Sequence, residues 1–274
     1  MQFKNQFISL SEPQVMGILN VTPDSFSDGG QHATVNQAVS HALKMVEQGA
    51  TFIDIGGEST RPGAPDVSLQ EELDRTIPVI EALAKQSDCV ISIDTSKAEV
   101  MKAAVTAGAG LINDVRALTG DGALEAAARA DVPVCLMHMQ GQPRTMQQNP
   151  TYDDVVKDVS TFLEHRVSAC VDAGIDSSRI LLDPGYGFGK TLEHNYALVK
   201  YLPNIMALGY PVLVGMSRKS MIGNLLNRNV DERLAGSISL ATIVAQMGAQ
   251  IIRVHDVQET ADAVNIVKML NTIK

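Results

Sequence analysis

The chain has 274 residues, of which 45% are hydrophobic and 19% are charged, and this is enough for one large apolar core. Its formal net charge of -9 disfavours a general nucleic-acid binder, because such proteins normally carry a basic stripe. We therefore expect a single domain over residues 1–274 and no nucleic-acid partner.

The first 14 residues are a preamble without a clear strand or helix pattern. Met1 to Pro13 lacks the basic and apolar regions of a signal peptide, and no run approaches the roughly 20 apolar residues that a membrane helix needs. We expect a cytoplasmic protein without a membrane partner. The isolated Cys89, Cys135 and Cys170 fit neither a disulfide framework nor a CxxC metal site, and we expect each to be a small buried apolar residue.

Short, nearly continuous apolar runs recur along the chain and predict parallel strands that are covered on both faces. In chain order these runs are Val15–Leu19, Phe52–Ile55, Val90–Ile93, Leu111–Ile112, Val134–Met137, Ile180–Leu182, Val212–Gly215 and Ile251–Val254. Helical patterns separate them, which favours an α/β fold, a single-domain TIM (β/α)8 barrel with its active site at the C-terminal strand ends. A doubly wound sheet is the main rival, but the G-x-G-x-x-G turn that often follows its first strand is missing.

Capping-box spacing predicts where several helices start. The pairs are Ser68 with Glu71, Ser96 with Glu99, Asp256 with Glu259 and, more weakly, Thr34 with Gln37. Four glycines are expected to close helices, namely Gly49, Gly108, Gly174 and Gly248. Pro78 lies inside a periodic helical stretch and predicts a kink or a fresh start there.

Each predicted strand stops at, or just before, a polar residue suited to molecular recognition. These residues are Asn20, Asp54, Asp94, Asn113, His138, Asp183, Ser217 and Arg253. In a closed barrel all strands end on the same face, so these groups would converge on one composite pocket. The pattern is typical of an enzyme.

Two loops near the start of the chain carry candidate ligand-binding groups. Asn20 opens a loop to Gly30 and can accept from a substrate or give an oxygen to Mg²⁺, although it also suits a turn cap. The loop Gly56–Gly63 holds Ser59, Thr60 and Arg61 and suits a closing anion clamp, with a plain solvated turn as the alternative.

Asp94, Asn113 and Asp183 follow strongly apolar strands and form a sharper set. Carboxylates and amides at a barrel mouth are well placed to accept N–H groups from a flat heterocycle. Helix capping explains Asp94 less well, because Ser96 already has capping-box spacing. Asp114 is an alternative to Asn113 as the recognition residue.

The segment from Asp183 to Thr191 nearly spells a phosphate-binding P-loop, but Pro184 replaces its first glycine, so we reject a nucleotide triphosphatase. Its glycines let the backbone approach a ligand, and Phe188 lines the pocket. His138 has no companion at metal-ligand spacing, so a structural role is favoured over that of a base or ligand.

Basic groups follow the last two predicted strands, where this fold commonly binds anions. They lie in the segment Ser217–Ser220 and at Arg253 and His255. The spacing of Arg253 and His255 places both on one side of an extended segment, where they can grip one oxyanion. A solvated surface pair is the alternative.

These segments together resemble the bacterial dihydropteroate synthase family. The resemblance is carried by MGILNVTPDSFSDGG (16–30), DIGGESTRPG (54–63), SIDT (92–95), INDV (112–115), DPGYGFGK (183–190), GMSRKS (215–220) and RVHD (253–256). It spans nearly the whole chain, and several long motifs occur in the right order. It implies condensation of 6-hydroxymethyl-7,8-dihydropterin diphosphate with p-aminobenzoate to give 7,8-dihydropteroate and diphosphate in folate biosynthesis.

The resemblance also implies roles for individual residues. The pterin would be held by Asp94, Asn113, Asp183 and Lys219; the diphosphate by Asn20, Arg61, Arg253 and His255; and p-aminobenzoate by Phe26, Thr60, Pro62, Phe188, Ser217 and Arg218. Catalysis would depend on Asn20, Arg61, Asp94, Lys219, Arg253 and His255, with Mg²⁺ as cofactor and Asn20 as its ligand. A homodimer and inhibition by sulfonamides are implied as well.

No residue stands out as an obligatory general base, so we expect a dissociative, SN1-like displacement. Two alternatives share the pterin set. A methyltransferase that moves a methyl group from methyltetrahydrofolate to a corrinoid protein would not need Arg61, Arg253 and His255. A non-catalytic pterin-binding protein would bind the substrate without turnover.

Overall fold

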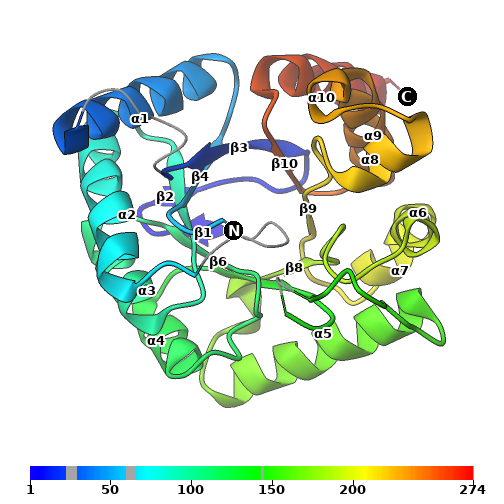
Figure 1. Cartoon of the computed structure of the whole chain (residues 1–274), viewed down its shortest axis with the longest axis horizontal. Helices are drawn as coiled ribbons and strands as arrows, with labels where there is room; N and C mark the ends of the chain where they lie inside the picture. Colours follow the sequence, from blue (N-terminus) through cyan, green and yellow to red (C-terminus); the bar gives the residue numbers. More distant parts are fainter. Residues whose placement is uncertain (23–29, 60–65, 143–144, 274) are drawn as a thin grey trace.

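A computed structural model describes residues 1–22, 30–59, 66–142 and 145–273. Within these residues, eight parallel strands form a central sheet that a ring of helices surrounds (Figure 1). The strands are β3 (Gln14–Asn20), β4 (Phe52–Gly56), β5 (Val90–Asp94), β6 (Leu111–Asp114), β7 (Val134–Met137), β8 (Ile180–Asp183), β9 (Leu213–Val214) and β10 (Ile251–Val254).

The helices lie on the outside of this sheet. They are α1 (Gly30–Glu47), α2 (Leu69–Ala84), α3 (Ala98–Ala107), α4 (Ala123–Ala130), α5 (Val155–Asp172), α6 (Leu192–Lys200), α7 (Leu202–Met206), α8 (Ser220–Leu226), α9 (Leu234–Met247) and α10 (Val257–Thr272). None of the helices in the described part of the chain has the length and apolar character needed to span a membrane.

The sheet closes into a barrel. Its strand order is β8-β7-β6-β5-β4-β3-β10-β9, and a parallel bridge between Leu182 and Val212 joins the two ends of this order. The N–H of Leu182 also donates to the carbonyl of Pro211 at 2.9 Å. The predicted (β/α)8 barrel is therefore confirmed, with β9 shorter than expected because Val212 contributes to the isolated bridge.

Each strand is apolar on both faces because two separate cores cover it. The outward side chains, such as Ile53, Ile55 and Ile93, pack with the helices in the larger core. Inside the barrel, every strand contributes one residue to an apolar floor. These residues are Met16, Phe52, Val90, Leu111, Cys135, Leu181, Leu213 and Ile251. Continuous apolar runs are the sequence signature of this double burial.

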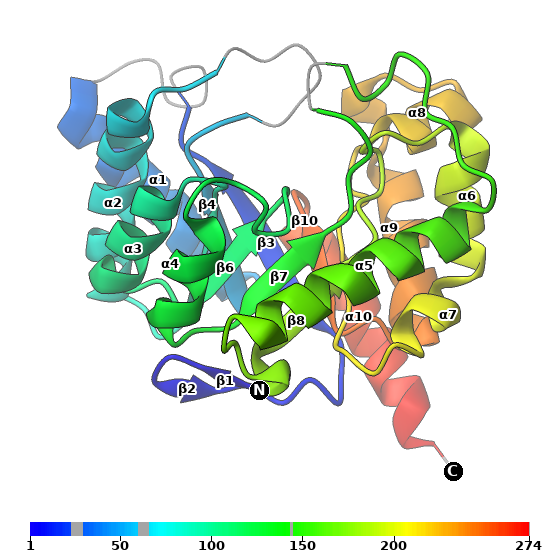
Figure 2. The ribbon, with the colours of Figure 1, turned by 90° about the horizontal axis from the view of Figure 1, so that it is seen from below.

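The N-terminal preamble closes the barrel from below. It folds into an antiparallel hairpin of β1 (Gln2–Phe3) and β2 (Gln6–Phe7), which lies at the end where the strands begin (Figure 2). Phe3 is 1% exposed and meets Phe52 edge to face, with ring centroids 5.0 Å apart. The sequence pattern did not reveal this hairpin, because its strands have two residues each.

Two of the four predicted capping boxes are overridden by contacts from distant segments. Ser68 does cap α2, and its Oγ accepts from the N–H of Glu71 at 3.2 Å. The prediction for Ser96 is wrong, because its hydroxyl donates to Asp114 and α3 starts at Ala98.

Asp256 precedes α10 as predicted but makes no side-chain cap, because Arg218 takes its carboxylate. Thr34 lies inside α1 rather than at its start. Gly108 and Gly248 end α3 and α9 with positive φ angles, whereas Gly49 and Gly174 follow just beyond the ends of α1 and α5. Helix α2 continues through Pro78 without starting again. Among the cysteines, Cys135 and Cys170 are buried as expected, but Cys89 is only partly buried.

Candidate active site

Directly above the apolar floor, the inward-facing positions of the strands become polar. Alternate residues of a strand face the same side, so positions two residues beyond the floor also point into the barrel. Five of them are polar: Asp54, Ser92, Asn113, Asp183 and Arg253. Four of the eight predicted strand-end groups, Asp54, Asn113, Asp183 and Arg253, are thus brought together over the apolar floor, and Ser92 joins them without having been predicted.

Asp54 is the centre of this polar layer. It is fully buried, and its Oδ1 accepts from Ser92 Oγ at 2.5 Å. Its Oδ2 accepts from Asn113 Nδ2 at 3.0 Å and from Arg253 Nε at 2.6 Å. Asp54 therefore orients its neighbours.

Arg253 bridges two carboxylates. Besides Asp54, it donates through Nη2 to Asp94 Oδ2 at 2.8 Å. Burial raises the pKa of Asp94 to about 7, although the Arg253 charge opposes this rise. The Asp94 carboxyl therefore changes its protonation state near neutral pH, where its ionisation can control ligand binding.

Asn20 at the end of β3 and Asp94 at the end of β5 lie on either side of Gly56 at the end of β4. A Cβ added to Gly56 would lie 3.8 Å from both Asn20 Oδ1 and Asp94 Oδ2, so the two oxygens flank one small space. The described residues contain no group of three or more His, Cys, Asp or Glu side chains that could hold a metal. Such a sparse oxygen set fits Mg²⁺ only if water and substrate oxygens complete its shell.

Asp183, Lys219 and Phe188 form another side of the site. Asp183 Oδ1 accepts from the N–H of Gly185 at 2.7 Å. Lys219 Nζ donates to the carbonyl of Tyr186 at 2.5 Å and lies 4.7 Å from the centroid of the Phe188 ring. Burial lowers the pKa of Lys219 to about 8, and the Asp183 charge opposes this shift. A carboxylate, a cation and an aromatic face are thus available to one ligand.

The glycine-rich segment after β8 is held by Lys190, a residue whose role the sequence pattern did not indicate. Its Nζ donates to the carbonyls of Gly185 at 2.8 Å and Phe188 at 3.0 Å and lies 3.0 Å from Nδ1 of His138. Lys190 is buried and its Nζ is bound by these protein groups, so it is not available to a phosphate, which supports the rejection of a triphosphatase. Burial also lowers the pKa of His138 to about 3, so this histidine is neutral and structural, as predicted.

Ser217 and His255 connect the ends of β9 and β10. The N–H of His255 donates to Ser217 Oγ at 3.1 Å, and its Nδ1 lies 3.1 Å from the same oxygen. Arg218 turns to Asp256 instead, with Nε 3.0 Å from Oδ2, and keeps 40% of its side chain exposed. Arg253 and His255 thus have different neighbours, and their joint grip on an anion stays a prediction.

The structure also decides between Asn113 and Asp114, the two candidates for the recognition residue after β6. The carboxylate of Asp114 accepts from Ser96 and from the backbone N–H groups of Arg116 and Leu118, both at 2.8 Å, so it stabilises the turn after β6. Asn113 instead faces the barrel. Four predicted site residues lie outside the described residues, namely Phe26, Thr60, Arg61 and Pro62.

Comparison with known proteins agrees with this geometry. The family model for the pterin binding enzyme matches residues 16–255. The dihydropteroate synthase of Escherichia coli (strain K12) is 56% identical over 261 residues, which cover 95% of this chain and 93% of the relative. The dihydropteroate synthase of Haemophilus influenzae is 54% identical over 262 residues, covering 96% and 95%.

Solved structures are similarly close. The Yersinia pestis dihydropteroate synthase in a sulfonamide drug complex superimposes with a TM-score of 0.95 at 57% identity, covering 99% of both chains. The Xanthomonas albilineans dihydropteroate synthase in complex with 7,8-dihydropteroate gives a TM-score of 0.91 at 49% identity, covering 99% of this chain and 98% of that one.

Proposed function

This chain belongs to the dihydropteroate synthase family of pterin-binding enzymes, and we propose that the polar layer at its barrel mouth carries out the family's reaction. The activity is the condensation of 6-hydroxymethyl-7,8-dihydropterin diphosphate with p-aminobenzoate, which forms 7,8-dihydropteroate and diphosphate for folate synthesis. The observation that carries the assignment of residues is the buried network of Asp54, Asp94, Asn113 and Arg253 above an apolar floor. The whole chain, residues 1–274, is proposed to work as one domain.

The pterin ring binds to Asp94, Asn113, Asp183 and Lys219. The aminopyrimidinone edge offers adjacent N–H donors, which suit carboxylate acceptors such as Asp183. One oxygen of Asp183 is already held by Gly185, which orients the carboxylate toward the ring. Lys219 donates to the ring acceptors, and Phe188 covers an aromatic face.

The diphosphate binds to Asn20, Arg61, Arg253 and His255. Arg253 keeps Asp54 as a partner through Nε and Asp94 through Nη2, and it donates its other N–H groups to the leaving oxygens. Mg²⁺, with Asn20 as its single protein ligand, would supply further positive charge for the departing diphosphate. The two oxygens beside Gly56 support this placement.

The p-aminobenzoate site is formed by Phe26, Thr60, Pro62, Phe188, Ser217 and Arg218. Arg218 supports this role because its guanidinium is partly exposed while Asp256 holds it in place. We expect sulfonamides to compete with p-aminobenzoate here, since the Yersinia pestis relative was solved with a sulfonamide.

The reaction proceeds as a dissociative, SN1-like displacement. The bond between the pterin methylene carbon and the diphosphate oxygen breaks, and the electron pair leaves with the diphosphate. The amine nitrogen then forms the new C–N bond, and its proton passes to water or to diphosphate. An arylamine is already unprotonated at neutral pH, so orientation and electrostatic stabilisation suffice without a dedicated base.

One assay tests this function. The protein is incubated with pterin diphosphate, p-aminobenzoate and Mg²⁺, and both diphosphate release and pteroate formation are followed. We expect equal amounts of the two products. Absence of amine-dependent pteroate formation would reject the assignment, and methyl transfer that survives Arg253→Ala would favour the methyltransferase. The stepwise mechanism fails if diphosphate leaves only after the amine binds and no pterin cation can be trapped without it.

We further propose that the protein acts in the cytoplasm as a homodimer. Three cysteines without a disulfide suit a reducing compartment. Helices α9 and α10 pack side by side and expose large apolar side chains, namely Ile243, Ile266, Met269 and Leu270. Exposed apolar patches of this kind mark protein interfaces.

Sedimentation velocity tests the dimer through Ile266→Asp on α10. We expect this change to shift the wild-type dimer to monomer, because it places a charge in the apolar contact. The exposed Val171 on α5 offers a control, and Val171→Asp should leave the dimer intact. A monomeric wild-type protein would contradict the proposal.

A further inference from the structure

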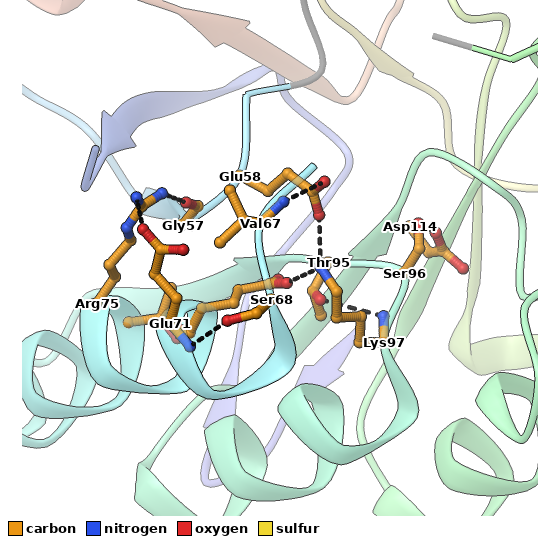
Figure 3. A network of polar contacts seen from close by, with 12 residues as sticks. Gly57, Glu58, Val67, Ser68, Glu71, Arg75, Thr95, Ser96, Lys97 and Asp114 are labelled. Carbon is orange, nitrogen blue, oxygen red and sulfur yellow. Dashed lines mark hydrogen bonds and ion pairs between the residues drawn. The ribbon is translucent and has the colours of Figure 1, made fainter. Parts of the chain in front are cut away.

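Glu58, Glu72 and Lys97 form an ion-pair cluster at the end of the barrel where the strands stop, here named the loop-2 anchor (Figure 3). Lys97 Nζ lies 2.5 Å from Glu58 Oε2 and also contacts Glu72 Oε2. Glu58 follows β4, Glu72 lies on α2 and Lys97 directly precedes α3. One cation therefore connects the segment after β4 to two helices.

The anchor fixes both described ends of the second loop, residues 57–67. Glu58 Oε1 accepts from the backbone N–H of Val67 at 3.3 Å, so the Glu58 carboxylate at the start of the loop binds the end of the loop. Arg75 Nη1 donates to the carbonyl of Gly57 at 2.6 Å. A Cβ added to Gly57 would lie 2.8 Å from Thr76 Cγ2, so the glycine lets the backbone pack directly on α2.

The same anchor is continuous with the pterin side of the site. Lys97 lies three residues after Asp94, and its N–H donates to Thr95 Oγ1 at 3.2 Å. The N–H of Thr95 donates to the carbonyl of Asn113 at 3.1 Å. Burial is the main cause that raises the pKa of Asp94, and the nearby Glu72 carboxylate adds to the rise. Glu72, the buried partner of Lys97, therefore contributes to the electrostatic environment of Asp94.

Stability alone does not explain this cluster. The Glu72 side chain is 1% exposed, and within the described part of the chain its Oε1 has no hydrogen-bond partner. Replacing a buried ion pair by apolar residues of similar volume is often neutral or stabilising, so such pairs are poor stabilising devices. A role in fixing the geometry of neighbouring segments accounts for it better.

We propose that Glu58, Glu72 and Lys97 are positioning residues, which tie Glu58 and Val67, the described ends of the second loop, to each other, to α2 and to the start of α3, and thereby set the affinity for p-aminobenzoate. The proposal rests on the function proposed above, because the loop carries two of the residues assigned to that substrate. The anchor contacts no substrate itself, and it acts through the loop ends.

Steady-state kinetics of Glu58→Ala tests the proposal. Glu58 is 31% exposed, so the variant keeps its fold, which thermal unfolding verifies. We expect the KM for p-aminobenzoate to rise roughly tenfold, the effect of one lost charge-assisted hydrogen bond. The kcat and the Kd of a pterin analogue should stay within about twofold of wild type, because the strand-end residues are unchanged. Glu99→Ala, on the exposed face of α3, is the matched control and should change neither constant.

Amide hydrogen exchange at Val67 provides a readout that does not depend on activity. Glu58→Ala should speed this exchange, whereas Glu58→Gln keeps an acceptor oxygen and should restore most of the protection. An unchanged KM for p-aminobenzoate, or an equal loss of pterin affinity, would overturn the proposal. If wild-type protein forms no pteroate, the proposed function fails, and unchanged Val67 exchange in Glu58→Ala would separately reject the anchor.

Discussion

Arg253 lies between the buried carboxylates of Asp54 and Asp94 and donates to both. One guanidinium thus reduces the repulsion between two acidic groups in a site of low dielectric constant. The same side chain is proposed to receive the leaving diphosphate. Charge balance in the protein and stabilisation of the leaving group therefore depend on one residue.

Replacing this residue should affect both stability and turnover. In Arg253→Met the two carboxylates lose their partner, and we expect the free energy of unfolding to fall by about 3–5 kcal/mol in urea titrations. The kcat/KM for pterin diphosphate should fall by roughly 100-fold or more, as for a lost transition-state donor. Arg253→Lys keeps the positive charge but lacks the forked geometry of the guanidinium. Its free energy of unfolding and its kcat/KM should therefore lie between those of wild type and Arg253→Met. Wild-type kcat/KM in Arg253→Met would contradict the assigned role.

The pH profile of kcat/KM for pterin diphosphate should be bell-shaped. Burial raises the pKa of Asp94 to about 7, so activity should rise through this pH as the carboxylate ionises to accept pterin N–H groups. Burial lowers the pKa of Lys219 to about 8, so activity should fall above it as the lysine loses its proton. Asp94→Asn removes the ionisation and should abolish the acid limb. An acid limb retained in this variant would assign it to another group.

The segment between β8 and α6 shows how an element depends on backbone contacts that side chains cannot replace. Gly185 has a φ of 69°, and a Cβ there would lie 1.9 Å from the carbonyl oxygen of His138. Lys190 Nζ donates hydrogen bonds to the carbonyls of this turn that point inward. The turn brings Phe188 to within 4.7 Å of Lys219, so its shape sets the pocket wall.

A glycine comparison tests this dependence. Gly185→Ala combines backbone strain with a direct clash and should lower the free energy of unfolding by more than about 3 kcal/mol. Gly209 has a similar φ of 85° but nothing within 4 Å of an added Cβ, so Gly209→Ala should cost only about 1–2 kcal/mol. Urea titration of both variants measures the difference. Equal losses would show that the contact with His138 is unimportant.

The whole barrel is closed at one end and polar at the other. The floor residues and Phe3 seal the end where the strands begin, while the strand ends carry the reactive groups. This arrangement keeps water out from below and raises the strength of the electrostatic contacts above. The N-terminal hairpin is therefore part of the barrel rather than a loose extension.

Two phenylalanines of this hairpin differ sharply in burial and provide a matched test. Phe3 is 1% exposed and Phe7 is 72% exposed. Phe3→Ala should lower the free energy of unfolding by about 3–5 kcal/mol, because it leaves a cavity below the floor. Phe7→Ala should stay within about 0.5 kcal/mol of wild type, as expected for an exposed site. A small effect at Phe3 would show that the hairpin is dispensable.

The barrel could be predicted because its strands are buried on both faces, so each appears as an uninterrupted apolar run that ends at a polar residue. The sites of Asp94, Asn113 and Asp183 follow from those strand ends. The caps at Ser96 and Asp256 could not be predicted in the same way. Their local spacing is correct, but Asp114 and Arg218 arrive from distant segments and form the stronger bonds.

The order of residues alone was enough to predict the alternation of strands and helices, the polar strand ends and, through long ordered motifs, the family. The strands and helices follow from local periodicity and the family from local motifs. Both can be recognised from residues that are close together in the sequence. The folded barrel was needed to show that Asp54 is the centre of the polar layer, that Lys190 faces inward and that Glu58 and Lys97 form an ion pair. Most of these contacts join residues that are 38 to 199 positions apart in the sequence, and closure of the barrel brings such partners together.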